Sequence, residues 1–202
     1  MVRFLFDLDG TVTACETLPM IAHHYGVLGE VEELTRKAVM GDMPFGESFG
    51  HRVALLGHLP VDEVSRLVAR TPLHELVVHF INAHRESCAI VTSNLDCWCS
   101  GLISRLGCRA HCSRALVSHN RVEAIARILN KEDIIGAYQA AGETVVFVGD
   151  GHNDRAAMSR ADLAIAVGLL PGTPAASLTT VATHVFHDEA ALCRQLEQMA
   201  CR

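Results

Sequence analysis

The chain is poor in aromatic residues and in positive charge, and both shortages limit what it can bind. Phenylalanine, tryptophan and tyrosine make up 5% of the 202 residues, so surfaces on which nucleic-acid bases stack are not expected. Lysine and arginine number 17 against 23 aspartates and glutamates, which gives a net charge of −6. Without a basic excess, we expect neither nucleic acid nor an anionic membrane as a partner.

Long apolar runs and targeting segments are also missing. No run of about 18 uninterrupted apolar residues occurs, so no membrane-spanning helix is expected. Residues 1–7 are too short and reach charge too early for a signal peptide, and no cleavage site comes after them. We therefore expect a cytoplasmic protein of one compact domain, or one domain with an inserted lobe. The sequence leaves monomer or homodimer undecided.

Eight cysteines are present, but nothing indicates secretion, so free thiols are the favoured interpretation. Four of them fall close together, at Cys97, Cys99, Cys108 and Cys112. Their spacing matches no zinc-ligand pattern, and the segment is predicted to be one helix and the residues directly after it. A structural zinc site is therefore not expected there.

The hydrophobic pattern predicts a short strand at the start of the chain and a long helical segment after it. Val2–Phe6 is an apolar run that ends at polar turn residues, as buried strands do. From about Glu16 to Arg70, apolar residues recur at helix spacing. Three or four short helices are expected in that segment, and one more from Pro72 to about Arg85.

Further along the chain, strands and helices alternate. The predicted strands are Cys88–Thr92, Thr144–Gly149 and Leu163–Val167, and the predicted helices are Leu95–Leu106, a helix that begins at Lys131, and Glu189–Met199. Such alternation indicates a parallel sheet covered on both faces. The predicted fold is therefore α/β, with a doubly wound, Rossmann-like core made by residues 1–14 and 75–202. A small helical-bundle cap, residues 15–74, is inserted after the first strand.

Polar side chains stand where three of the predicted strands end. Asp7 follows the first strand, Thr92 ends the second and precedes Ser93 and Asn94, and Asp150 follows the TVVFVG strand. In a doubly wound sheet, ligands bind beyond the carboxyl ends of the strands. We therefore expect these side chains to meet at one binding edge.

Four carboxylates belong to that edge: Asp7, Asp9, Asp150 and Asp154. Carboxylates grouped in this way either protonate or bind a cation. Mg²⁺ prefers oxygen ligands and shares its coordination between carboxylates, waters and substrate phosphates. The sequence therefore predicts Mg²⁺ as the cofactor.

Two further residues indicate that the ligand is a phosphate ester. The Thr92 hydroxyl precedes a predicted helix, whose first N–H groups favour an anion. Lys131 offers a positive charge at the start of another helix. An aspartate beside a metal, a lysine and a hydroxyl can attack phosphorus and form an aspartyl-phosphate. A helix cap for Thr92 and a surface position for Lys131 remain alternatives.

These residues stand in four motifs that together resemble the haloacid dehalogenase superfamily. Asp7–Val12 (DLDGTV) resembles its motif I, Thr92 its motif II, Lys131 its motif III and Gly149–Asp154 (GDGHND) its motif IV. All four occur in order and span most of the chain. The resemblance implies the predicted α/β core and a phosphatase activity that uses an aspartyl-phosphate.

The resemblance also implies a role for each residue. Asp7 would be the nucleophile, Asp9 the general acid and base, and Lys131 the residue that holds phosphate and Asp7. The implied metal contacts are the Asp7 side chain, the Asp9 carbonyl and the Asp150 side chain. Asp154 would either support these ligands or contact the metal itself, and Asn153 would reach the phosphate.

The helical insert resembles the cap of phosphoserine phosphatases. Those enzymes carry a glutamate after motif I and an arginine in an RVxLL-type helix, which here are Glu16 and Arg52. A glutamate can bind an ammonium group, and an arginine can bind a carboxylate with two hydrogen bonds. That family also lines its pocket with a methionine and a phenylalanine. Phe45 matches the phenylalanine, whereas Val39, with Met40 beside it, stands at the methionine position as a departure. A helix cap for Glu16, a surface-reaching Arg52 and core positions for Val39 and Phe45 remain open alternatives.

The sequence departs from that family at several points. Gly10 stands where a serine is common, and Ser93 and Asn94 replace two glycines, which places their side chains beside the substrate. The stretch 108–131 is short, which leaves less room for the hairpin expected there.

The sequence thus predicts a Mg²⁺-dependent phosphomonoesterase acting on a small phosphorylated metabolite that resembles an amino acid. O-phospho-L-serine is the best single substrate. The alternatives are another small phosphorylated metabolite, or transfer of the phosphoryl group to an alcohol. A non-catalytic binding protein is disfavoured because every catalytic position carries suitable chemistry.

Overall fold

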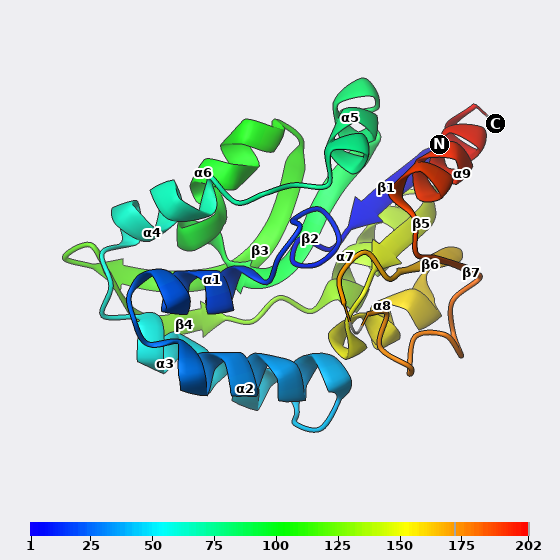
Figure 1. The fold of residues 1–202 in the computed structure, drawn as a ribbon. Helices are drawn as coiled ribbons and strands as arrows, with labels where there is room; N and C mark the ends of the chain where they lie inside the picture. Colours follow the sequence, from blue (N-terminus) through cyan, green and yellow to red (C-terminus); the bar gives the residue numbers. More distant parts are fainter. Residues whose placement is uncertain (172, 202) are drawn as a thin grey trace.

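The computed structural model describes residues 1–171 and 173–201, without the side chain of Val39. Within these residues, seven strands form one sheet in the order β4-β3-β2-β1-β5-β6-β7 (Figure 1). Neighbouring strands are parallel except β3 and β4, which are antiparallel. The strands are β1 (Val2–Phe6), β2 (Cys88–Leu95), β3 (Arg109–Ser118), β4 (Arg121–Arg127), β5 (Thr144–Gly149), β6 (Leu163–Val167) and β7 (His184–Phe186).

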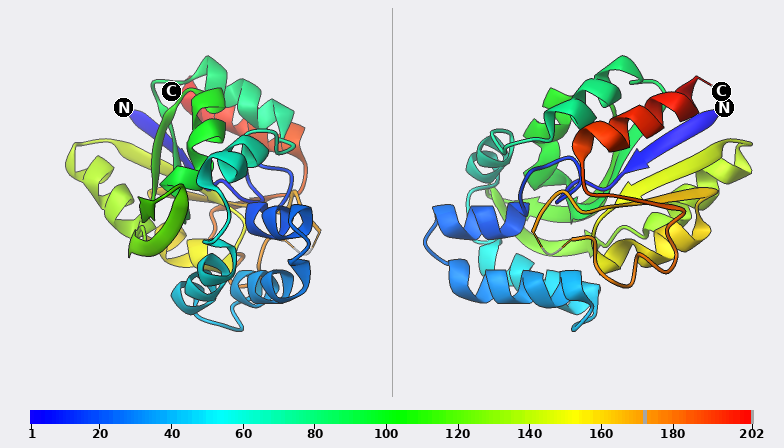
Figure 2. Two further views of the ribbon diagram at one scale, coloured as in Figure 1. Left: turned by 90° about the vertical axis from the view of Figure 1, so that its left-hand side faces the viewer. Right: turned by 45° about the vertical axis from the view of Figure 1, so that its right-hand side comes forward.

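Helices cover both faces of this sheet (Figure 2). They are α1 (Thr17–His24), α2 (Leu28–Met40), α3 (Phe45–Leu56), α4 (Val61–Val68), α5 (Glu75–Ala83), α6 (Asp96–Leu106), α7 (Lys131–Ala140), α8 (Arg155–Arg160) and α9 (Glu189–Ala200), with a 3₁₀ turn η1 (His152–Asp154). The predicted α/β, doubly wound fold is confirmed.

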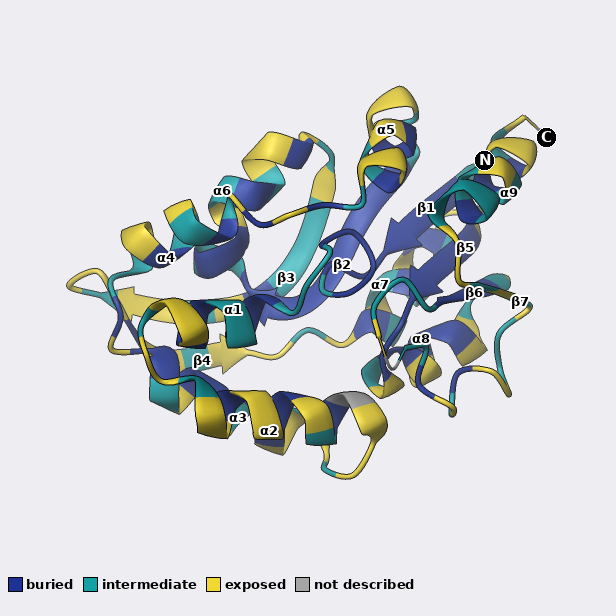
Figure 3. Cartoon of the chain, viewed as in Figure 1, coloured by how far each residue is buried: buried dark blue, intermediate teal, exposed yellow. Residues whose placement is uncertain are grey.

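The alternation of side chains along β1 explains why both faces need helices. Phe4 and Phe6 lie on one face, where their rings pack edge-on against Phe80 of α5 with centroids 5.1 and 6.2 Å apart. Leu5 points to the opposite face and belongs to the cluster formed with α7 and α8. Because β1 is apolar on both sides, it is stable only in the middle of a sheet covered twice. Figure 3 shows the central strands as buried.

The insert α1–α4 follows β1 and lies beyond the carboxyl ends of the central strands (Figure 1). Its two connections to the sheet run side by side. Thr13 pairs antiparallel with Leu73, Ala14 N donates to Pro72 O at 2.8 Å, and His74 N donates to Val12 O at 3.0 Å. This paired stem lies at the expected borders of the cap, whereas α4 also packs against α6. The division into core and cap stays a prediction.

The hairpin expected in residues 108–131 is present, although the segment is short. β3 and β4 pair there and are joined by a tight turn at His119 and Asn120, whose φ angles are +48° and +62°. A two-residue turn with two positive φ angles matches the twist of a hairpin and needs little chain. The turn also docks on the cap, because Val61 N donates to Asn120 O at 2.8 Å.

Element ends differ from the sequence expectations by a few residues. β2 continues three residues beyond Thr92, α5 begins at Glu75 rather than Pro72, and α6 begins one residue after Leu95. The sequence pattern does not predict β7, since His184–Phe186 is short and half-exposed at the edge of the sheet. All eight cysteines are free, as expected. Among the described residues, no helix combines the length and the apolar character that crossing a bilayer requires.

Candidate active site

The site forms at β1, where the order of the strands reverses: β2 lies on one side of β1 and β5 on the other. Phe6 pairs with Val148 in the parallel register, and Asp7 N extends that pairing by donating to Val148 O at 2.9 Å. Asp7 and Asp150 therefore leave adjacent strands side by side. This is the position at which doubly wound sheets bind ligands.

Lys131 binds two of the carboxylates at once. Its Nζ lies 2.7 Å from Asp7 Oδ1 and 2.6 Å from Asp154 Oδ1, and all three side chains are buried. Burial alone would lower the pKa of Lys131, but the charges of Asp154 and Asp7 outweigh it and raise the pKa. Lys131 is thus a permanent cation at the bottom of the site, and the alternative of a surface lysine is wrong.

Asp7, Asp150 and Asp154 form a group of carboxylates that suits a divalent cation. One oxygen from each lies within 4.8 Å of the others. Asp150 Oδ2 is buried and has no hydrogen-bond partner among the described residues. An unpaired buried carboxylate oxygen is costly unless a cation meets it. The donor set therefore fits a hard divalent metal.

Gly10 explains how the loop after β1 reaches Asp150. Its φ is +69°, and a Cβ at this position would lie 2.3 Å from Asp150 Oδ2. A side chain here would both strain the backbone and collide with the carboxylate. Gly149 likewise leaves room for Asp154, whose Oδ2 would lie 2.4 Å from a Cβ on Gly149.

The electrostatics of these carboxylates favour the binding of a cation. Burial and then the charge of Asp154 raise the pKa of Asp7 to about 7, although Lys131 opposes the shift. Burial and then the charge of Glu16 raise the pKa of Asp150 well above its usual value. Burial and mutual repulsion thus favour the protonated form of both groups, and a bound cation would oppose that shift.

Asp9 lies apart from this group and is held differently. Its Oδ1 accepts a hydrogen bond from Thr17 N at 2.7 Å, and its Oδ2 is 3.4 Å from Asn94 Nδ2. Leu8 between the two aspartates is fully buried in the core. Asp9 is half-buried and lines a pocket rather than the metal group. This separation suits a residue that moves protons.

The end of β2 supplies hydroxyl and amide groups to the same pocket. Thr92 Oγ1 accepts a hydrogen bond from Asn94 N at 3.1 Å, which leaves its hydroxyl hydrogen free to donate to a ligand. The pairing of β2 with β3 shifts register between Val91 and Leu95. That irregularity turns Thr92, Ser93 and Asn94 toward the site, where all three are buried.

A pocket lies between the cap and these strand ends. Its lining residues are Asp9, Glu16, Leu18, Ala38, Phe45, Phe49, Arg52, Thr92, Ser93, Asn94 and Asn153. The six expected substrate-binding residues whose side chains are described all belong to this set. The seventh, Val39, is the residue whose side chain lies outside the described structure. Met40 beside it is 51% exposed and does not line this pocket.

Arg52 is the buried cation of the cap side. Nε donates to Ser48 O at 3.3 Å and Nη1 to Thr35 Oγ1 at 3.1 Å, and the guanidinium lies 5.7 Å from the centre of the Phe45 ring. Nη2 is buried without a partner in the described part of the chain. Burial lowers the pKa of Arg52, and Glu16 opposes that shift. The surface-reaching alternative is therefore wrong.

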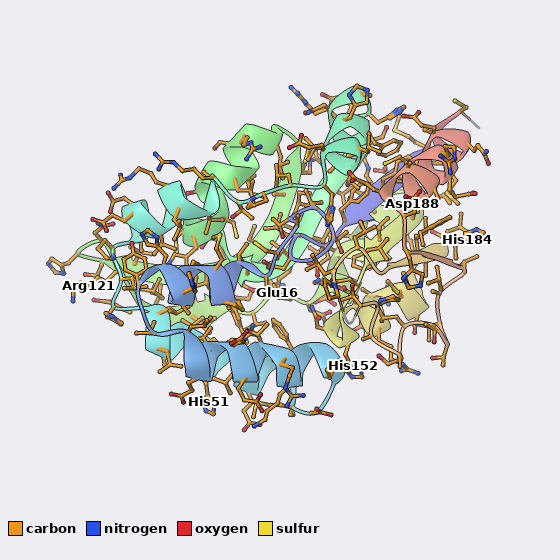
Figure 4. All side chains as sticks on the ribbon, viewed as in Figure 1. Glu16, His51, Arg121, His152, His184 and Asp188 are labelled. Carbon is orange, nitrogen blue, oxygen red and sulfur yellow. The ribbon has the colours of Figure 1, made fainter. Side chains whose placement is uncertain are left out.

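Glu16 lies at the junction between the loop after β1 and helix α1 (Figure 4). Burial, followed by the charges of Asp9 and Asp7, raises its pKa to about 8. Glu16 and Arg52 share the pocket, yet they form no ion pair with each other within residues 1–171 and 173–201. The pocket thus presents one acidic and one basic side chain, each of which is available to a ligand. Glu16 precedes α1 but makes no side-chain capping bond there.

Several functional residues were not found from the sequence. Phe49 stands four residues after Phe45 and three before Arg52, so helix spacing alone could have placed it on the pocket face. Thr35 and Ser48 anchor Arg52, but nothing in the sequence shows that α2 and α3 pack together there.

Comparison with known proteins identifies the family. The model of a haloacid dehalogenase-like hydrolase matches residues 3–162. The chain is 30% identical over 175 residues to a phosphoserine phosphatase of Archaeoglobus fulgidus, covering 80% of this chain but 51% of that protein. It is 30% identical over 177 residues to a phosphoserine phosphatase of Methanocaldococcus jannaschii, covering 80% of this chain and 83% of that one. The chain thus spans about half the length of the first relative and most of the second.

Solved structures share the fold. A phospho-aspartyl intermediate analogue of phosphoserine phosphatase superposes with a TM-score of 0.80 at 24% identity, covering 96% of this chain and 99% of that one. A substrate-bound phosphoserine phosphatase superposes with a TM-score of 0.81 at 24% identity, covering 98% and 97%. The family match over most of the sequence, with relatives and folds that agree, shows that the chain belongs to the haloacid dehalogenase-like hydrolases.

Proposed function

We propose that the chain is a Mg²⁺-dependent phosphatase that hydrolyses a small phosphorylated amino acid, with O-phospho-L-serine as the substrate it fits best. The observation that carries this proposal is that Arg52, whose Nη2 is buried without a partner among the described residues, and Glu16 line one pocket. Relatives named phosphoserine phosphatases, aligned over four fifths of this chain, support the same substrate.

The two charged groups of the cap fit the two charged groups of an amino acid. The guanidinium of Arg52 would bind the substrate carboxylate, because its free Nη2 donates to an anion. Glu16 would bind the ammonium group, whose charge favours the ionised form of a carboxyl with a pKa near 8. Binding the zwitterion would thus give both side chains an oppositely charged partner. Phe45 and Phe49 shape the pocket around the short carbon chain.

Asp7 is the proposed nucleophile. Leu8 N donates to Asp7 Oδ1 at 2.8 Å and Lys131 Nζ lies 2.7 Å from the same oxygen, so the carboxylate is held in a fixed plane. The carboxylate attacks phosphorus and forms an aspartyl-phosphate, while the seryl oxygen leaves with a proton from Asp9. Asp9 then takes a proton from the water that attacks the aspartyl-phosphate. Phosphate leaves and both carboxylates return to their starting states.

The remaining residues orient the phosphate. Lys131 has one proton beyond the two that meet Asp7 and Asp154, and the Thr92 hydroxyl hydrogen is free, so both can donate to phosphate oxygens. Asp7, Asp150 and the Asp9 carbonyl would hold Mg²⁺, with Asp154 beside them. The metal would neutralise phosphate charge so that an anionic carboxylate can approach. Asn153, in η1, lines the same pocket and would contact the phosphate.

A substrate panel tests this proposal. Purified protein with MgCl₂ is offered O-phospho-L-serine, O-phospho-L-threonine, phosphohomoserine and 4-nitrophenyl phosphate, and released phosphate is measured. We expect the highest kcat/KM for phosphoserine, and no turnover by Asp7→Asn. Equal rates for all substrates would contradict the amino-acid pocket. Adding an alcohol acceptor and measuring new phosphate ester separates hydrolysis from phosphoryl transfer.

A further inference from the structure

Asn94 joins the first turn of the cap to the strand that ends beside the nucleophile. Its side chain is 4% exposed, and its Oδ1 accepts a hydrogen bond from Leu95 N at 2.8 Å. Because a main-chain N–H only donates, this bond fixes which end of the amide is oxygen. Nδ2 must therefore point the other way, where it donates to Thr17 Oγ1 at 2.6 Å and lies 3.4 Å from Asp9 Oδ2.

Thr17 completes a triangle with these two side chains. It is the first residue of α1, is fully buried, and donates its main-chain N–H to Asp9 Oδ1 at 2.7 Å. Oδ1 is therefore occupied by a short bond at a helix N-terminus, where a negative charge is favoured. Oδ2, with only the longer contact to Asn94, is the oxygen left to carry a proton.

The amide of Asn94 also restricts where that proton can point. Both hydrogens of Nδ2 are donors, so a protonated Oδ2 cannot direct its O–H toward Asn94. Its remaining direction is the pocket, which Asp9 and Asn94 line together with Thr92. The hydroxyl of Oδ2 is thus aimed at the space where a leaving oxygen would stand.

We propose that Asn94 is a positioning residue that, through Thr17, aims Asp9 at the leaving oxygen of the substrate. This inference rests on the proposed function. When the P–O bond breaks, its electron pair goes to the leaving oxygen, which takes the proton of Asp9 Oδ2 and leaves Asp9 as a carboxylate. A misaimed Asp9 slows this step only when the leaving oxygen needs the proton. The cost of losing Asn94 therefore depends on the leaving group.

The test compares esters that differ in their need for an acid. A 4-nitrophenolate departs without protonation, a phenolate less easily, and a seryl alkoxide hardly at all. The quantity measured is kcat/KM, which includes the first P–O cleavage and excludes hydrolysis of the aspartyl-phosphate. We expect Asn94→Ala to lower kcat/KM about tenfold for phosphoserine, about fivefold for phenyl phosphate and about twofold for 4-nitrophenyl phosphate. These losses are a fraction of the full contribution of general acid catalysis, because Asp9 itself is still present.

Two further variants keep the result interpretable. Thr17→Val preserves shape and removes the acceptor of the Asn94 amide, so it should show the same dependence on leaving group at smaller amplitude, and it carries the test if Asn94→Ala does not fold. Ser113→Ala is the matched control. Ser113 of β3 contacts the same end of β2, because its Oγ donates to Ser93 O at 2.6 Å, but it makes no hydrogen bond to Asp9. Ser113→Ala should lower kcat/KM by the same factor for all three esters. Thermal unfolding confirms that each variant is folded.

Two outcomes separate the inference from the proposed function. An active wild-type protein in which Asn94→Ala and Thr17→Val lose the same factor for every ester would overturn the role of Asn94 alone. A wild-type protein that cleaves none of the esters would overturn the proposed function and this inference with it. A loss that grows steadily from 4-nitrophenyl phosphate to phosphoserine in both variants, and not in Ser113→Ala, supports it.

Discussion

Replacing Arg52 by alanine should separate substrates that carry a carboxylate from those that lack one. In the structure, Nε and Nη1 of Arg52 are anchored on Ser48 and Thr35, whereas Nη2 is buried without a partner among the described residues. A substrate carboxylate would take a charge-assisted hydrogen bond from Nη2, strengthened by the second hydrogen of Nη1. Such contacts to a charged group contribute about 2–3 kcal/mol, which corresponds to about 30–150-fold in affinity.

The assay compares two substrates that differ only by the carboxylate. O-phospho-L-serine carries it, and O-phosphoethanolamine keeps the ammonium group but lacks the carboxylate. We expect Arg52→Ala to raise KM for phosphoserine by about 30–150-fold and to leave KM for phosphoethanolamine within about threefold. Arg66→Ala is the matched control, because Arg66 carries the same charge on the outer surface of the cap, paired with Asp62. Equal effects of Arg52→Ala on both substrates would refute the assignment.

The remaining predictions concern the catalytic edge. Asp9→Asn should abolish turnover but largely preserve divalent-metal binding, because the Asp9 side chain lies outside the group of carboxylates that suits the metal. Calorimetry measures that binding, and its loss would contradict the role assigned to Asp9. Gly10→Ala should weaken divalent binding, since its Cβ would lie 2.3 Å from Asp150 Oδ2, and unchanged affinity would contradict the packing. Metal-free protein should lose stability as pH rises from about 4 through 7, because the pKa of Asp7 rises from 3.8 to about 7 on folding and the folded state holds the extra proton. MgCl₂ should flatten that profile in urea unfolding experiments, and a metal-free stability that increases over this range would contradict the sign.

The catalytic edge was predictable because its residues sit at strand ends. Asp7, Thr92 and Asp150 each follow an apolar run, and parallel strands bring their carboxyl ends to one edge whatever the loops do. Lys131 was found by chemistry and motif rather than by position. Its contacts with Asp7 and Asp154, 124 and 23 residues away along the chain, depend on the packed fold.

The cap was harder because its pocket depends on how helices pack against one another. The anchoring of Arg52 on Thr35 requires the pairing of α2 with α3, which helix periodicity does not determine. Gly10 looked like a departure from a family pattern, yet its positive φ and its approach to Asp150 give it a physical reason. The short segment 108–131 still forms the expected hairpin of β3 and β4, because a two-residue turn at His119 and Asn120 needs little chain.

The proposed mechanism depends above all on Asp7 becoming covalently phosphorylated during turnover. The experiment that addresses this step mixes the protein with O-phospho-L-serine and MgCl₂, quenches it in acid within one turnover and locates added phosphoryl groups by peptide mass spectrometry. We predict one phosphoryl group on Asp7 of the wild-type protein, and none in Asp7→Asn. Steady release of phosphate with no phosphorylated Asp7, or a phosphoryl group on a different residue, would contradict the mechanism.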